Sequence, residues 1–422
     1  MVGKECGVFG YMLKQHSEMY LSGCVCHLIH IAAEKGAASL PFNISQLLVD
    51  VFYYLDKSSK RQGDLKCFQL LHDMKETKIL KHVATRWLSI GKCLPRLIDS
   101  WDALYDFFKS EEKSAKENNT KKKVTHLKEI FGSRTKKLYC LFLRDAIKDF
   151  EKINTELQSD TPMIHSLANK LQSFYKTLMI KFVKPSAILG QDILSVNFSD
   201  SKNIKDASDL KIGPGAMSFL ESVSIKQERK SEFFNHVVLF YQAVCSYMTK
   251  KDKLGATKLP FKDPLLQHLT VTDPSTQLTS SFADLEFFLK KFPSLINSSS
   301  ISDIKNEFPN FQCTDISSII SPRIDTTWFN IWELQENGKQ LFTHLPRIML
   351  SLLTIPHSSA HCERIFSVVR KNKTDFRGNM SRDTLEALVV SKSRPGAALD
   401  RTYTDKELKE LKSAYYRSLQ SH

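Results

Sequence analysis

Two cysteines and two histidines near the start of the chain could do metal chemistry: Cys24, Cys26, His27 and His30 lie within seven residues. Thiolate and imidazole groups are the usual ligands of structural zinc, which takes four of them in a tetrahedron. Such ligands usually come from two separated pairs, and no second pair follows here at a matching spacing. We therefore expect no metal and no other cofactor, with zinc as the weaker alternative.

A second group with chemical potential is His361-Cys362-Glu363, near the other end of the chain. A thiol protease needs a nucleophile, a base and an orienting group aligned in space. Adjacent residues of a helix point in different directions, so these three neighbours cannot form that line. The protease reading is excluded, and any chemistry at Glu363 needs partners from elsewhere in the chain.

Composition and charge narrow the class of protein. The 422 residues carry a formal net charge of +14, and the pI is about 9.2. A basic surplus attracts polyanions, nucleic acid above all, although a solvated basic surface is the alternative. The nine cysteines are an odd, scattered set, as in reduced intracellular proteins. The sequence contains no stretch of about 18 apolar residues, so no membrane span is predicted. No signal peptide is recognisable.

Helical periodicity dominates the hydrophobic pattern. Apolar residues recur at every third and fourth position, for example over 138–157 and 233–248, which predicts core faces of a helical bundle. Residues 20–25 are interpreted as a short strand that leads into a helix over 27–38. The polar stretch 111–125 contains three successive lysines and predicts a surface loop.

Three motifs, in fixed order, resemble the hAT family of DNA transposases. Cys24-Val25-Cys26-His27 resembles the family's C-x-x-H landmark, and Thr85-Arg86-Trp87-Leu88-Ser89 resembles the T-R-W-x-S box of its helical insertion. Cys362-Glu363-Arg364-Ile365-Phe366-Ser367 resembles the C-terminal box, and Leu385-Glu386-Ala387-Leu388-Val389-Val390 follows it. The resemblance covers nearly the whole chain. It is strongest to vertebrate zinc-finger-associated proteins derived from hAT transposases.

The resemblance implies a nuclease triad of two aspartates and one glutamate that hold divalent metal, with Glu363 as the glutamate. In-line cleavage of a phosphodiester with two metals needs several converging carboxylates. Both family aspartates precede the C-x-x-H landmark, whereas the first aspartate of this chain is Asp50. We therefore expect Glu363 to be vestigial, the chain not to be an enzyme, and the family's first strands and N-terminal zinc finger to be missing.

Arg86 and Trp87 are the candidate nucleic-acid-binding residues. The resemblance implies that the tryptophan stacks on a flipped base and that the arginine lies beside the DNA. Stacking on an aromatic ring contributes about 1–3 kcal/mol per base. The alternative, which we favour for a truncated chain, is that Trp87 belongs to a helical core.

The expected fold is mostly α, a truncated RNase H-like α/β remnant interrupted by a large helical insertion domain. The predicted domains are residues 1–40 for the remnant, 41–320 for the insertion, 321–395 for the hAT C-terminal dimerisation region and 396–422 for a charged tail.

The expected function is non-catalytic: a transposase-derived interaction protein that pairs with itself or with a related hAT-derived protein. A basic DNA-binding regulator with weak nucleic-acid affinity is the alternative, and an active transposase-type nuclease comes third. The expected location is nuclear, with the cytoplasm as alternative. The candidate dimerisation residues are apolar side chains near the C-terminus, namely Leu345, Leu352, Ile365, Phe366, Leu385 and Leu388.

Overall fold

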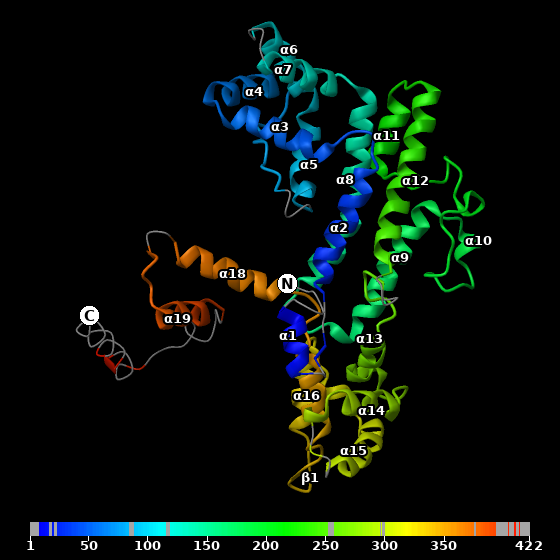
Figure 1. The fold of residues 1–422 in the computed structure, drawn as a ribbon, viewed down its shortest axis with the longest axis vertical. Coiled ribbons are helices and arrows are strands. Elements are labelled where there is room, and N and C mark those ends of the chain that lie inside the picture. Colours follow the sequence, from blue (N-terminus) through cyan, green and yellow to red (C-terminus); the bar gives the residue numbers. More distant parts are fainter. Residues whose placement is uncertain are drawn as a thin grey trace. The chain divides into compact units, whose positions relative to one another are not determined.

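The protein is mostly helical, as predicted, in the computed structural model (Figure 1). The structure describes residues 8–16, 19–20, 23–83, 88–114, 119–251, 257–295, 297, 300–374, 377–393, 404, 409, 410 and 413. The chain divides into two compact units, Met1–Ser358 and Ser359–His422. None of the helices in the described ranges is long and apolar enough to cross a membrane.

The first unit contains seventeen of the described α-helices. Its first nine are α1 Val8–Gln15, α2 Val25–Ala38, α3 Ile44–Asp56, α4 Ser59–Leu71, α5 Ile90–Asp99, α6 Trp101–Ser114, α7 Asn119–Phe131, α8 Arg134–Leu157 and α9 Leu167–Phe182. The others are α10 Pro185–Ile188, α11 Pro214–Ser222, α12 Gln227–Thr249, α13 Pro264–His268, α14 Phe282–Lys291, α15 Ile301–Cys313, α16 Ile324–Trp332 and α17 Leu345–Leu353. The second unit holds α18 Ala360–Asn372 and α19 Arg382–Ser393.

The strands of the described residues are two short ones, β1 Gln335–Glu336 and β2 Lys339–Gln340, paired antiparallel. Asn337 and Gly338 join them with φ angles of 53° and 75°, the left-handed conformation that such tight turns require. An RNase H-like remnant therefore remains a prediction from the resemblance.

The longest helix, α8, organises the first unit. Phe142, Ile147 and Phe150 on α8 are fully buried. Helices α2, α5, α11 and α12 pack against α8 (Figure 1). Because side chains from these four helices pack against it, α8 forms the centre of this helical core.

The strand expected over residues 20–25 is wrong in its described part. Val25 is the first residue of α2, and Gly23 and Cys24 have no regular secondary structure. Val25, Ile29 and Ala33 are all buried on one helical stripe, so a helix covers more apolar surface than a strand would. The predicted helix over 27–38 is confirmed, and it packs closely on α12 and α8.

The surface loop expected over 111–125 is also wrong in its described part. Helix α6 continues to Ser114, and α7 begins at Asn119. One of the three lysines that suggested a loop has an acidic partner, because Lys123 pairs with Asp50 at 2.6 Å. Val124, which also belongs to α7, is fully buried. Paired charge and one buried face stabilise the helix despite its polar composition.

The carboxylate of Glu307, on another helix, caps the N-terminus of α17. Glu307 on α15 accepts hydrogen bonds from the backbone N–H groups of Thr343 at 2.9 Å, His344 at 3.1 Å and Leu345 at 2.7 Å, and from the Thr343 hydroxyl at 2.8 Å. The first N–H groups of a helix lack partners within it and favour a negative charge. Glu307 therefore fixes where α17 begins and ties it to α15.

Replacing Glu307 with alanine should lower the free energy of unfolding by roughly 1–3 kcal/mol, because several N–H donors lose their acceptor. The measurement is the midpoint of urea unfolding followed by circular dichroism. Asn306→Ala is the matched control, since Asn306 is exposed on the same helix. Equal midpoints for the two variants would show that the contact contributes nothing.

Candidate dimerisation surface

Two of the six candidate dimerisation residues lie inside the first unit. Leu345 is 0% exposed and Leu352 is 1% exposed. Both belong to α17, whose apolar face packs against α15 and α16. The assignment of Leu345 and Leu352 to a contact between chains is therefore wrong for this fold, because the chain's own core covers them.

A hydrogen bond ties the residues that follow α17 to the C-terminus of α8. The hydroxyl of Ser358 donates a hydrogen bond to the carbonyl of Leu157 at 2.7 Å. That carbonyl belongs to the last turn of α8, where carbonyl groups have no partner within the helix. The first unit thus ends at a defined anchor directly before α18.

Two half-buried histidines, His165 and His357, lie near this anchor. Nδ1 of His165 and Nε2 of His357 have no hydrogen-bond partner among the described residues. Burial lowers the pKa of His165, and the Asp273 carboxylate opposes this effect. Burial also lowers the pKa of His357, against the opposing effect of the Leu157 carbonyl. Both rings are therefore neutral in the folded protein at neutral pH.

These two histidines should make the first unit less stable as the pH falls below about 6.5, the ordinary histidine pKa. The unfolded chain takes up protons there, whereas the folded chain does so only at lower pH. Urea midpoints between pH 7.5 and 5.5 test this, and His357→Gln should make the decline shallower. The control His27→Gln, at an exposed residue of α2, should keep the parent slope. A His357→Gln slope equal to the parent's would contradict the argument.

The second unit is a hairpin of α18 and α19, which pack on each other. The Ser381 hydroxyl accepts the backbone N–H of Thr384 at 3.2 Å and caps α19, a role for which serine is well suited. Across the pair, Lys392 Nζ donates to Asn372 Oδ1 at 2.7 Å. Asn372 is one of the few well-buried residues of the hairpin, so a polar contact helps to set how the two helices meet.

The apolar side chains of this hairpin are only partly covered. Phe366 on α18 is 70% exposed, and Val390 on α19 is 49% exposed. Six others are half-buried: Ile365, Val368, Val369, Leu385, Leu388 and Val389. In the described part of the hairpin, Ala360 is the one apolar residue that is buried. The hairpin thus carries an apolar face that its two helices do not bury.

Residues 318–394 match the family model for the hAT family C-terminal dimerisation region. This stretch, the hAT region, is the part of the chain that is similar to the hAT family. The matched region includes the whole described hairpin and also α16 and α17 of the first unit. The hAT region therefore crosses the boundary between the two units at Ser358 and Ser359.

The two parts of the hAT region differ in how their apolar residues are used. In the first part, Trp328 is fully buried, and its indole N–H donates to the Thr272 carbonyl at 2.7 Å. In the second part, Ile365, Phe366, Leu385 and Leu388 stay half-buried or exposed. These four of the six candidates are the ones that the hairpin leaves at least partly exposed.

Sequence reasoning missed Val368, Val369 and Val390. The signal for the first two was present, since Val368 and Val369 lie one helical turn from Ile365 and continue its stripe. Val390 follows the motif leucines on α19. Its exposure could be seen only once the two helices had been paired.

Glu363 lies on α18 and is exposed. Within the described ranges, no group of three or more His, Cys, Asp or Glu side chains is placed to hold a metal ion. Of the cysteine and histidine cluster, Cys26 is buried and His27 is exposed, so the two point to different sides of α2.

Arg86 and Trp87 lie outside the described residues, so their predicted roles remain predictions. The residues on either side of them are tied together. Ser89, the last residue of the T-R-W-x-S box, lies with its hydroxyl 2.9 Å from Nδ1 of His82. The same hydroxyl accepts the backbone N–H of Val83 at 3.1 Å. Burial lowers the pKa of His82 and keeps its ring neutral.

Proposed function

We propose that this hAT protein is a non-catalytic, transposase-derived interaction protein that pairs with a second copy of itself, or with a related hAT-derived chain, through the α18–α19 hairpin. The observation that carries the proposal is the uncovered apolar face of the hairpin. The most exposed large apolar residue of the hairpin is Phe366, which is 70% exposed. A match to a dimerisation region over the same helices supports it.

Burial of apolar surface would drive the pairing. Burying a large apolar side chain stabilises an association by about 1.5–3 kcal/mol. Two helices alone cannot enclose a core, whereas two hairpins packed face to face form a four-helix arrangement that can. In such an arrangement Phe366 and Val390 leave water, and Leu385 and Leu388 complete their burial.

Phe366→Ser should shift the protein from dimer to monomer in light scattering at micromolar concentration, because the most exposed apolar side chain of the hairpin is lost. The parent should have about twice the mass of the 48.3 kDa chain. Leu278→Ser is the matched control, since Leu278 is an 81% exposed apolar residue of the first unit. A monomeric parent, or equal dissociation in both variants, would refute the proposed surface.

The non-catalytic part of the proposal rests on the carboxylates of this sequence. Glu363 is the one residue that matches the family triad, and it is exposed on α18. Two metals that cut a phosphodiester in line need several converging carboxylates. The residues before the C-x-x-H landmark supply no aspartate, so we infer that this chain alone does not cut DNA.

Glu363→Gln should accordingly leave every biochemical property of the protein almost unchanged. The assay is strand cleavage of a hairpin-forming transposon end with magnesium or manganese, and both proteins should be inactive. Cleavage by the parent that disappears in Glu363→Gln would overturn the non-catalytic assignment. It would mean that a partner chain supplies the missing carboxylates.

A basic DNA-binding regulator is the second candidate, favoured by the net charge of +14. The hairpin contributes exposed basic residues at its ends, among them Arg370, Lys371, Lys373, Arg377 and Arg382. Binding driven by such charges releases counterions, so affinity for DNA should fall steeply with salt. Such a dependence in a protein that stays monomeric would favour this candidate. A nuclear location fits either function, and an RNase H-like remnant and a zinc-finger-associated ancestry remain part of the proposal.

A further inference from the structure

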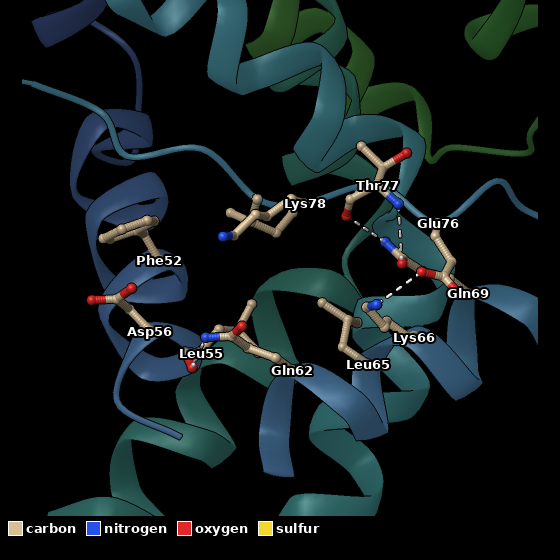
Figure 2. Close-up of a pocket in the computed structure, with 11 residues that line it drawn as sticks. Phe52, Leu55, Asp56, Gln62, Leu65, Lys66, Gln69, Glu76, Thr77 and Lys78 are labelled. Carbon is tan, nitrogen blue, oxygen red and sulfur yellow. Dashed lines mark hydrogen bonds and ion pairs between the residues drawn. The ribbon is translucent and has the colours of Figure 1, made fainter. Parts of the chain in front are cut away.

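A hollow of about 310 Å³ lies between α3, α4 and the extended segment that follows α4. Its floor is apolar, because Leu55, Leu65 and Ile79 are buried there and the ring of Phe52 forms one wall (Figure 2). Small-molecule sites typically combine an apolar floor of this kind with a few polar groups, in volumes from roughly 300 Å³ upwards. Neither the hAT region nor the proposed pairing uses this hollow.

The far wall of the hollow is held in place by Gln69. Its amide nitrogen donates to the carbonyl of Thr77 at 3.0 Å, and its oxygen accepts the N–H of Thr77 at 3.3 Å. The same nitrogen also donates to the Ser100 hydroxyl at 3.0 Å. Gln69 is 1% exposed, so segment 76–79 is fixed by a buried, fully used amide. The hollow is therefore part of the folded architecture.

The charged groups at the mouth are not equivalent. Lys66 pairs with Glu76 at 2.9 Å, which neutralises one side of the rim. Lys78 has no ion-pair partner in the described part of the chain. Figure 2 shows its side chain reaching across the hollow toward Phe52, whereas the Asp56 carboxylate points to the outside. One unpaired cation thus stands over an apolar floor.

We propose that this hollow binds a small molecule with a compact apolar body, such as an aromatic ring, that carries a carboxylate group. The ring enters between Phe52, Leu65 and Ile79, and replaces water on apolar surface. The carboxylate pairs with the ammonium group of Lys78 at the mouth. The paired Lys66 and Glu76 add no net charge, so the preference for an anion comes from Lys78.

The probes are 3-phenylpropionate, its neutral alcohol and its amine analogue, titrated against the full chain by ligand-observed NMR. The carboxylate should bind with a dissociation constant on the order of 1 mM. It should bind roughly three- to fivefold more tightly than the alcohol, as one partly exposed ion pair allows. The amine should bind least well. No binding of the carboxylate, or equal binding of all three probes, would overturn the proposal.

Reversing the charge locates the site on the protein. Lys78→Glu should invert the preference, so that the amine binds more tightly than the carboxylate. Lys75→Glu is the matched control, because Lys75 is exposed on the same segment but does not line the hollow. An unchanged preference in Lys78→Glu, or an equal change in Lys75→Glu, would show that the probe responds to overall charge or binds elsewhere. Both lysines are exposed, so folding, checked by circular dichroism, should be retained.

Discussion

Burial of the apolar surface of α8 is the interaction on which the first unit depends. Helices α2, α5, α11 and α12 all pack against it, and its large side chains, such as Phe142 and Phe150, are completely covered. Each of them contributes a gain of roughly 1.5–3 kcal/mol when it leaves water. Because these helices pack on the same surface, a substitution in one of them should disturb the packing of the others. The end of α8 also anchors the residues that lead to α18, through Leu157 and Ser358.

In the described part of the second unit, no helix plays a comparable role. Its two described helices contact each other, but Phe366 and Val390 are 70% and 49% exposed. The same family region therefore contains two kinds of apolar surface. Trp328 and Leu345 complete the core of their own unit, whereas Ile365, Phe366 and Leu388 are half-buried or exposed. The proposed pairing surface therefore lies after Ser358, in the part of the hAT region whose apolar side chains are not fully covered.

Polar side chains that bond to backbone groups set the positions of the less regular elements. Glu307 decides where α17 starts because the first N–H groups of that helix need an acceptor. Gln69 holds an extended segment against α4 and thereby shapes the hollow beside it. In both cases one side chain satisfies several backbone groups at once, which an apolar contact could not do. The hollow and the hairpin are separate features, and the proposed roles of the two do not depend on each other.

The sequence by itself determined the helical class, the motif order and the position of the C-terminal hAT region. Those features depend on local periodicity and residue identity. It also indicated four residues of the apolar hairpin face. The Asn337–Gly338 pair was a readable signal for the β1–β2 turn that the pattern analysis passed over. Only the tertiary structure decided that Val25 is helical, that Lys123 is paired and that Leu345 and Leu352 are core. Each of these outcomes depends on a partner distant in the chain: α12 for Val25, Asp50 for Lys123, and α15 and α16 for the leucines. A stripe of apolar residues shows that a face will be covered, but the fold decides whether the chain itself or a second molecule covers it.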